Sequence, residues 1–257
     1  MRHREPAICL RATDYSETSQ VVHFLARESG VVRLLAKGTK RPKSKSGGAI
    51  DLLAEGDLVF TAPGGEALGT LIEFTETTAR PRLRRDAARL NVALYMIELA
   101  GALLAEGDPH PEAFDLLHGA RFRLAQPDAP APAVLAYYQW RLLRHVGLMG
   151  ELRACVECGR AIDPTRRRRD GVYFSSSGGG LLCGDCEGVA TEKYLLEAPA
   201  PAGLAALAAA QAGKRVLLPD AQAHAVNRLL AYHAAYQLGR PLKTARLAIP
   251  PVESGRQ

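Results

Sequence analysis

The sequence predicts an α+β protein in which a small N-terminal β-barrel precedes an all-α helical domain that carries a four-cysteine zinc finger. Three observations point to this fold class. Short segments rich in β-branched residues fill the first eighty residues, apolar residues recur at helical spacing from residue 86 onward, and two Cys-x-x-Cys pairs interrupt the helical part. We therefore expect a barrel over 1–80, a first helical part over 81–152, the finger over 153–190 and a second helical part over 191–257.

Five short segments predict the strands of the barrel, and turn-forming residues bound most of them. They are Pro6–Thr13, Ser19–Arg27, Gly30–Gly38, Asp57–Pro63 and Ala67–Glu76. At this length, five closely spaced strands without a helical period favour a five-stranded OB-type barrel (an OB-fold). Strand pairing cannot be read from one sequence, so a small SH3-like barrel stays open.

A cationic loop is expected between the third and fourth strands, over Lys37–Ala49. It contains no acidic residue, and its proline and glycines disfavour a helix. The five cations in this loop are Lys37, Lys40, Arg41, Lys43 and Lys45. Such a segment is either a solvated basic loop or a surface that binds an anionic partner.

The overall charge also favours anionic partners. The chain of 257 residues has a formal net charge of +6, which favours nucleic acid first and an anionic membrane second. No apolar segment follows the charged start of the chain, so we expect no export signal. The most apolar run, Leu90–Glu106, includes Asn91 and Glu98, and we interpret it as a buried amphipathic helix and not as a membrane span.

Helical spacing of apolar residues predicts five helices. They cover Asp86–Glu106, His110–Ala125, Val134–Gly150, Ala202–Ala212 and Asp220–Arg240, with a Pro-rich connector at Ala125–Ala133. Aromatic residues of the third helix, Tyr137, Tyr138 and Trp140, are expected in the core or in an interface.

The two Cys-x-x-Cys pairs predict a structural zinc site. Cys155, Cys158, Cys183 and Cys186 would supply four thiolates, which leaves no position open for water. A dithiol redox centre is the weaker alternative, because neither pair opens a helix after a strand of a βαβ unit. Structurally idle cysteines are the third alternative. Cys9 stands alone in the first strand and is expected to be a small buried apolar residue.

Further candidates concern nucleic-acid contacts and catalysis. The arginine run Arg166–Arg169 is either a solvated loop or an additional phosphate contact. Tyr15, Phe24, Phe60 and Phe74 are candidates for stacking on bases, although each could instead belong to the barrel core. No phosphate-binding loop, metalloprotease, hydrolase or dinucleotide motif is present, so the sequence does not predict an enzyme.

Three stretches carry a resemblance to a known family. They are "DYSETSQVVHFLARESGVVRLLAKGTKRPKS", "DLLAEGDLVF" and "CVECG … GGGLLCGDC". In these stretches, and in the order of barrel, helices and embedded knot, the chain resembles the RecO family of bacterial recombination mediators. The resemblance covers nearly the whole chain, and the first stretch is the most specific.

The resemblance implies an OB-fold, a helical domain and a zinc finger. It implies a non-enzymatic DNA repair and recombination mediator that binds single- and double-stranded DNA and anneals complementary strands. With RecR, such a mediator helps RecA to load onto DNA coated by single-strand-binding protein. A cytoplasmic, nucleoid-associated location and no membrane partner are expected. A zinc-ribbon scaffold for protein contacts, with incidental DNA binding, and an unrecognised enzyme such as a nuclease are the alternatives.

Two sets of cations follow as candidate binding residues. Those expected to contact DNA are Arg33, Lys37, Lys40, Arg41, Lys43, Lys45, Arg80, Arg82, Arg84 and Arg85. Relatives dock the acidic C-terminal tail of single-strand-binding protein on the helical domain. Arg141 and Arg144, beside the aromatics of the third helix, are therefore the candidates for that contact.

Overall fold

The computed structural model describes residues 1–41, 48–62, 68–77, 81–150, 152–162, 172–210 and 218–251, and the side chains of residues 81 and 82 lie outside this description. The chain divides into two compact units, Met1–Gln126 and Pro127–Gln257. This boundary falls inside the region 81–152, which was expected to form the first helical part, and the division into four regions stays a prediction.

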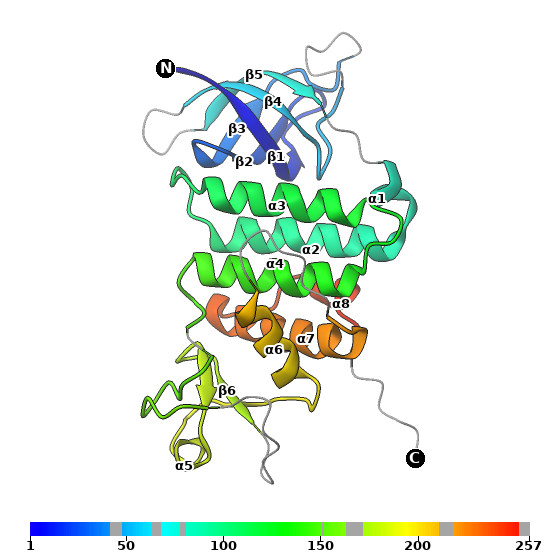
Figure 1. Ribbon diagram of the computed structural model, residues 1–257. Helices are drawn as coiled ribbons and strands as arrows, with labels where there is room; N and C mark the ends of the chain where they lie inside the picture. The colour runs from blue at the N-terminus through cyan, green and yellow to red at the C-terminus, as the bar shows by residue number, and fades with distance from the viewer. Residues whose placement is uncertain are drawn as a thin grey trace. The chain divides into compact units, whose positions relative to one another are not determined.

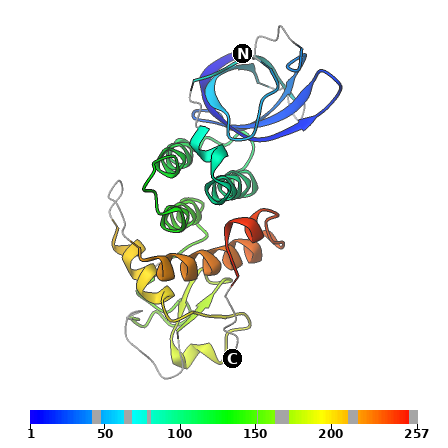
Figure 2. The same ribbon diagram turned by 90° about the vertical axis from the view of Figure 1, so that its right-hand side faces the viewer.

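The first unit begins with a closed five-stranded barrel (Figures 1 and 2). Its strands are β1 (Arg2–Asp14), β2 (Gln20–Ala26), β3 (Gly30–Ala36), β4 (Glu55–Thr61) and β5 (Gly69–Glu76). They follow one another around the barrel as β1-β2-β3-β5-β4, and Figure 2 shows them as a ring. The predicted OB-type barrel is confirmed.

Strand β1 pairs with two different strands, β4 and β2. Its first half, Arg2–Ile8, pairs with β4, and its second half, Ala7–Asp14, pairs with β2. A bulge between Cys9 and Arg11 shifts the register of the pairing with β2, and such a bulge bends the strand. β1 is longer than predicted because it runs through Pro6, whose carbonyl accepts the Arg27 N–H at 3.0 Å.

The barrel interior is filled by alternating apolar side chains, as a small barrel demands. Its buried members include Cys9, Val22, Phe24, Leu34, Leu58, Phe60 and Phe74. Cys9 is fully buried, and burial raises the pKa of its thiol to about 12, which confirms the expected apolar role. The ring closes through a short parallel contact, in which Leu34 and Leu35 of β3 face Gly69 and Thr70 of β5.

Three helices complete the first unit: α1 (Pro81–Arg85), α2 (Ala87–Leu103) and α3 (Pro111–Leu124). Asp86 caps α2 by accepting the Arg89 N–H at 3.1 Å. Helix α2 is buried on more sides than its predicted apolar stripe, because β1 and α3 both pack against it. The short α1 was not predicted, since five residues are too few to show a helical period.

A buried ion pair joins the barrel to α3. Arg121 lies on the buried side of this helix as a charged group, only 1% exposed. Its guanidinium donates to the Glu55 carboxylate and to the Leu53 carbonyl, and His118 contacts the same carboxylate. This network holds the first residue of β4, Glu55, against α3.

The second unit is built around α4 (Ala131–His145) and α7 (Asp220–Leu238), with α6 (Ala200–Ala209) against α7 and the short α8 (Ala245–Ala248) near the end. A buried Gln139–Asn227 hydrogen bond of 2.9 Å joins α4 to α7. α4 begins inside the predicted Pro-rich connector, because proline is accommodated in a first helical turn. Tyr138 and Trp140 are buried, so their predicted core role is confirmed.

A small three-stranded sheet stands between α4 and α6 in the sequence. It consists of β6 (Tyr173–Ser175), β7 (Gly180–Leu182) and β8 (Tyr194–Leu195), with the one-turn helix α5 (Gly184–Glu187) after β7. The cysteines lie at this sheet. Within the described residues, no helix has the length and apolar character needed to cross a membrane.

Candidate metal centre and nucleic-acid interface

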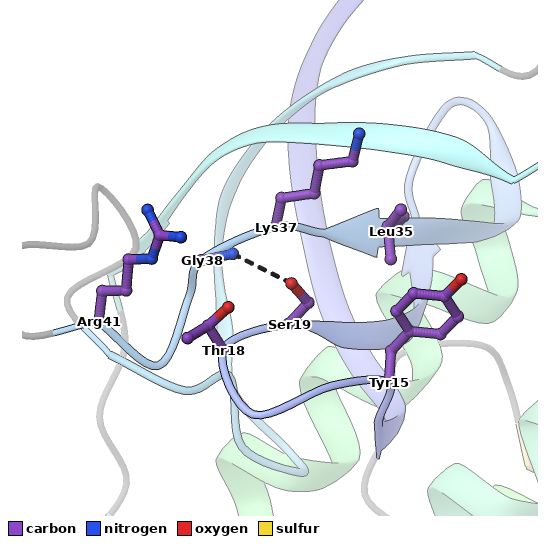
Figure 3. A pocket seen from close by; sticks show the side chains of 7 residues that line it. All are labelled: Tyr15, Thr18, Ser19, Leu35, Lys37, Gly38 and Arg41. Carbon is purple, nitrogen blue, oxygen red and sulfur yellow. Dashed lines mark hydrogen bonds between the residues drawn. The ribbon is translucent and has the colours of Figure 1, made fainter.

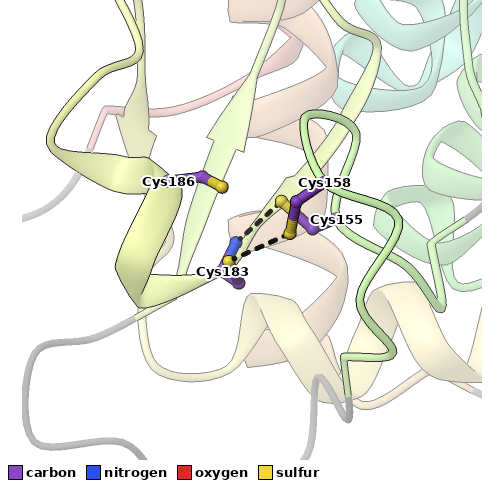
Figure 4. A group of neighbouring side chains, drawn as sticks. All are labelled: Cys155, Cys158, Cys183 and Cys186. Atoms are coloured by element: carbon purple, nitrogen blue, oxygen red, sulfur yellow. Dashed lines mark hydrogen bonds between the residues drawn. The ribbon is translucent and has the colours of Figure 1, made fainter.

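The four cysteines converge on one point (Figure 4). The sulfur atoms of Cys155, Cys158, Cys183 and Cys186 all lie within 4.8 Å of one another, and those of Cys158 and Cys183 are 3.7 Å apart. Four thiolates about 2.3 Å from a single ion would lie about 3.8 Å from each other. The cluster therefore has the dimensions of a tetrahedral site that could hold a metal ion.

Two tight turns aim the thiols inward. In the first turn, Gly159 has a φ of +70°, and its N–H donates to the Cys155 carbonyl at 2.9 Å. A residue with a side chain would be strained at this φ, so glycine is needed here. In the second turn, Cys183 precedes α5 and the Cys186 N–H donates to its carbonyl at 3.1 Å. Gly184 begins this short helix.

The thiols favour an added cation. Burial would raise the pKa of the Cys155 thiol, but backbone N–H groups of Cys183, Cys158 and Glu157 outweigh burial and lower it to about 6. Hydrogen bonding to the sulfurs of Cys158 and Cys183 raises the pKa of Cys186 to about 12. The cluster thus releases its first proton readily and retains its last one as negative charge accumulates. A divalent metal ion would balance this accumulated negative charge.

The cysteine turns and their sheet are fastened to each other and to α7. Arg160, just after the first pair, forms an ion pair with Asp185 between the second pair. Glu192 accepts the Ser176 N–H at 2.6 Å and the Tyr232 hydroxyl of α7 at 2.9 Å. Unfolding at the thiol cluster should therefore also loosen the part of α7 that Glu192 contacts.

The outer face of the barrel carries a cross-strand row of basic side chains, which we call the basic ladder: Arg11 on β1, His23 on β2 and Arg33 on β3. His23 pairs directly with both arginines, so the three side chains share one face. Burial lowers the pKa of His23, the two arginines lower it further, and Glu106 opposes this shift. Arg33 lies 3.7 Å from Glu106.

A pocket lies at the end of β3, next to the turn between β1 and β2 (Figure 3). Its volume is about 290 Å³, and its lining residues are Tyr15, Thr18, Ser19, Leu35, Lys37, Gly38 and Arg41. Figure 3 shows Tyr15 beside Leu35 on one side and Arg41 on the other. The pocket therefore combines an aromatic ring with two cations, which suits a ligand that has both a planar ring and negative charge.

The structure separates the expected DNA-contacting cations into four groups. Arg33, Lys37 and Arg41 lie on the barrel face or at the pocket. Lys40 forms an ion pair of 2.6 Å with Asp14, the last residue of β1. Arg84 of α1 forms one of 2.7 Å with Asp51, and Arg85 of α1 is exposed. Lys43, Lys45, Arg80, the Arg82 side chain and Arg166–Arg169 fall outside the described residues.

The candidates for base stacking also separate. Phe24, Phe60 and Phe74 are at most 3% exposed and belong to the barrel core, so they cannot stack on a base. Tyr15 is 66% exposed. Sequence reasoning could not choose among the four, because the face of a strand residue depends on register.

The two candidates on the helical unit lie on α4. The Arg144 guanidinium stands 5.3 Å from the centre of the Trp140 ring and is exposed, whereas Arg141 is half-buried. Sequence reasoning missed Arg11 and His23 of the basic ladder. Their alternation with apolar neighbours was visible, but their partners across the sheet were not.

A barrel of the OB type, joined to a helical unit with a four-thiol site, is the class of protein that this fold and site define. Comparison with known families matches the chain to both halves of one family. The N-terminal model of recombination protein O matches residues 1–79 and its C-terminal model matches residues 84–246. The chain belongs to the recombination protein O (RecO) family of DNA repair and recombination proteins.

Curated relatives agree with the family models. The chain is 33% identical to the DNA repair protein RecO of Anaeromyxobacter sp. strain Fw109-5 over 93% of this chain and 92% of that protein. It is 32% identical to that of Anaeromyxobacter dehalogenans strain 2CP-1 over 95% of each. The match to the Rhodopirellula baltica protein is 34% identical over 70% of this chain and 65% of that protein. The predicted resemblance is confirmed.

Proposed function

We propose that this protein is a non-enzymatic recombination mediator that binds single- and double-stranded DNA and anneals complementary strands. With RecR, it promotes loading of RecA onto DNA coated by single-strand-binding protein. The family supports this role, and one observation carries it for this chain: the basic side chains of Arg11, His23 and Arg33 form a row on the barrel face.

Annealing requires no catalytic group. It requires a surface that neutralises the phosphates of two strands at once, so that pairing proceeds without mutual repulsion. OB-type barrels commonly bind oligonucleotides on the face of strands 2 and 3, which here carries His23 and Arg33. The pocket cations Lys37 and Arg41 extend this surface.

We propose that Cys155, Cys158, Cys183 and Cys186 hold one structural Zn²⁺. A bound zinc ion would supply folding free energy to the finger and no open coordination position. Elemental analysis of protein purified without chelators should give close to one zinc per chain. Intact free thiols with negligible zinc would refute the assignment.

We propose that the helical unit binds the acidic, apolar-ended tail of single-strand-binding protein through Arg141 and Arg144. Arg144 is exposed and Arg141 is half-buried, so both guanidinium groups can reach the acidic groups of such a peptide. A labelled tail peptide should bind saturably at low salt, and Arg144→Ala should weaken that binding. RecR contact and nucleoid association in the cytoplasm complete the proposed role.

Strand annealing tests the proposal directly. Two complementary oligonucleotides, each coated with single-strand-binding protein, should pair faster when this protein is added. Labelled DNA incubated with Mg²⁺ should remain uncut. Absence of both annealing and DNA binding would favour the alternative of a zinc-ribbon interaction scaffold, and cleavage that scales with purified protein would favour a nuclease.

A further inference from the structure

We infer that the pocket at the end of β3 takes one unpaired nucleobase of a DNA strand, stacked on Tyr15, with the flanking phosphates on Lys37 and Arg41. The inference rests on the proposed function and deepens it. It assigns a subsite where the protein distinguishes a single strand from a duplex.

Tyr15 is presented for stacking by a fixed turn. Tyr15 is 66% exposed, and the backbone of its turn is hydrogen-bonded. The N–H groups of Tyr15 and Ser16 donate to the Ser19 carbonyl at 3.0 and 3.2 Å. An aromatic ring held out by such a turn has few rotatable bonds to immobilise, so little entropy is lost when a base stacks on it.

The two walls of the pocket are fastened together. Lys40 is paired with Asp14 at 2.6 Å, and its backbone N–H donates to the Thr18 carbonyl at 3.3 Å. The Gly38 N–H donates to the Ser19 hydroxyl at 3.4 Å, a contact drawn in Figure 3. Binding would therefore meet a preformed site.

The lining matches one nucleotide in chemistry and size. Leu35 and the Tyr15 ring offer apolar surface, and Thr18 and Ser19 offer hydroxyl groups. Drug-sized ligands occupy pockets of about 300–1,000 Å³, so the 290 Å³ found here suits a single base. Among the described residues, Asp14 is the acid closest in sequence to Tyr15, and its carboxylate is paired with Lys40.

The position of the pocket fits a continuous strand path. Leu35 follows Arg33 by two residues on β3, so both side chains point to the outer face of the barrel. The basic ladder ends on β3 at Arg33, and from there the outer face of β3 continues through Leu35 to the pocket. A paired base would have to leave its stack before it could reach the Tyr15 ring, whereas an unpaired base is already available.

A base-removal experiment tests the inference with the full-length protein. Fluorescence anisotropy would compare an oligothymidine with a chain of equal length made of abasic sugar phosphates, which keeps the charges and removes the bases. Wild-type protein should bind the oligothymidine at least about fivefold more tightly. Tyr15→Ala should lower that ratio at least about threefold, and Tyr15→Phe should preserve it, because only the ring is needed.

Control variants separate stacking from charge. Lys37→Gln should weaken binding to both chains alike. Tyr236→Ala, which removes a 45% exposed tyrosine from α7, should change neither. Duplex binding should stay within about twofold in Tyr15→Ala, because paired bases do not reach the ring.

The outcomes distinguish the subsite from the proposed function. An unchanged ratio in Tyr15→Ala, or an equal loss on duplex and single strand, overturns the subsite and leaves DNA binding intact. Failure of the wild-type protein to bind any of the DNA chains overturns the proposed function itself.

Discussion

Arg121 shows how one residue can determine the packing of an element. Its guanidinium is buried against Glu55, so loss of the cation leaves a carboxylate in a poorly solvated position. We expect Arg121→Met to lower the free energy of unfolding by about 3–5 kcal/mol, and Glu55→Gln in the same chain to restore part of it. Urea denaturation of the two variants measures both effects.

Arg27 provides the matched control. It joins the end of β2 to Asp115 of α3 through hydrogen bonds of 3.0 and 2.9 Å, but this pair is exposed. Arg27→Met should therefore cost much less stability than Arg121→Met, because solvent screens an exposed ion pair. Equal losses for Arg27→Met and Arg121→Met would contradict the view that burial sets the cost.

His23 should make DNA binding depend on pH. Burial, Arg11 and Arg33 hold its pKa below the ordinary 6.5, and Glu106 opposes them, so the imidazole is neutral at pH 7. A nearby phosphate would favour protonation. Affinity should therefore rise as the pH falls from 7.5 to 5.5, by at most about tenfold per pH unit for one proton.

Titration of binding against pH, at constant ionic strength, checks this expectation. His23→Gln should flatten the profile, and His224→Gln, on α7, should not. The same linkage gives stability the opposite trend: the folded state is destabilised as the pH falls below about 6.5, because the unfolded chain then binds the proton more readily. Identical binding profiles for both variants would exclude His23 from the DNA path.

At the scale of elements, the start of β3 depends on Gly30. Its φ is +69°, and an added Cβ would lie 1.9 Å from the Asp108 carbonyl oxygen in the segment after α2. Gly30→Ala should therefore cost more than the backbone strain alone, which is about 1–3 kcal/mol. Thermal and urea unfolding measure the loss.

A substitution at Gly107 shows the cost of backbone strain without a steric clash. It has a φ of +74° and open space around the position of a Cβ, so Gly107→Ala should show only the strain. A Gly30→Ala variant no less stable than Gly107→Ala would contradict the close approach of β3 and this segment.

The second element is the finger, which we expect to loosen when its proposed metal ion is removed. Removal of the proposed metal ion leaves four thiols crowded within 4.8 Å, so the local structure should loosen. Hydrogen exchange after chelation should accelerate over 172–195 and in the part of α7 around Tyr232, while the barrel stays protected. Uniform protection in all three regions would show that the metal does not support this fold.

The sequence predicts elements well and long-range partners poorly. Strand alternation and cysteine spacing are local signals, so the barrel and the four-cysteine cluster could be predicted. Arg121 and Glu55 are 66 residues apart, and no local pattern shows that they meet. The core role of Phe24 and the exposure of Tyr15 likewise depend on strand register, which only the folded chain defines.

At the scale of the whole molecule, the positions of the positive charges should affect DNA binding more than the net charge does. Lys37→Gln with Arg41→Gln lowers the formal charge from +6 to +4, and Arg240→Gln with Arg246→Gln does the same in the second unit. If the pocket cations contact phosphates, the first pair should flatten the dependence of log K on log salt by about 1.4 units on a single strand. Filter binding across a salt series measures both slopes, and equal slopes would place the strand elsewhere.

The division of β1 between two partners also constrains the order in which the chain can fold. Its first half pairs with β4, which lies some fifty residues later in the chain, while its second half pairs with the adjacent β2. During synthesis the β1–β2–β3 meander can form early, but half of β1 must wait with its backbone groups unpaired until β4 has left the ribosome. Such distant pairing slows closure, so the nascent barrel passes through an open-edged intermediate that is exposed to aggregation and to chaperones.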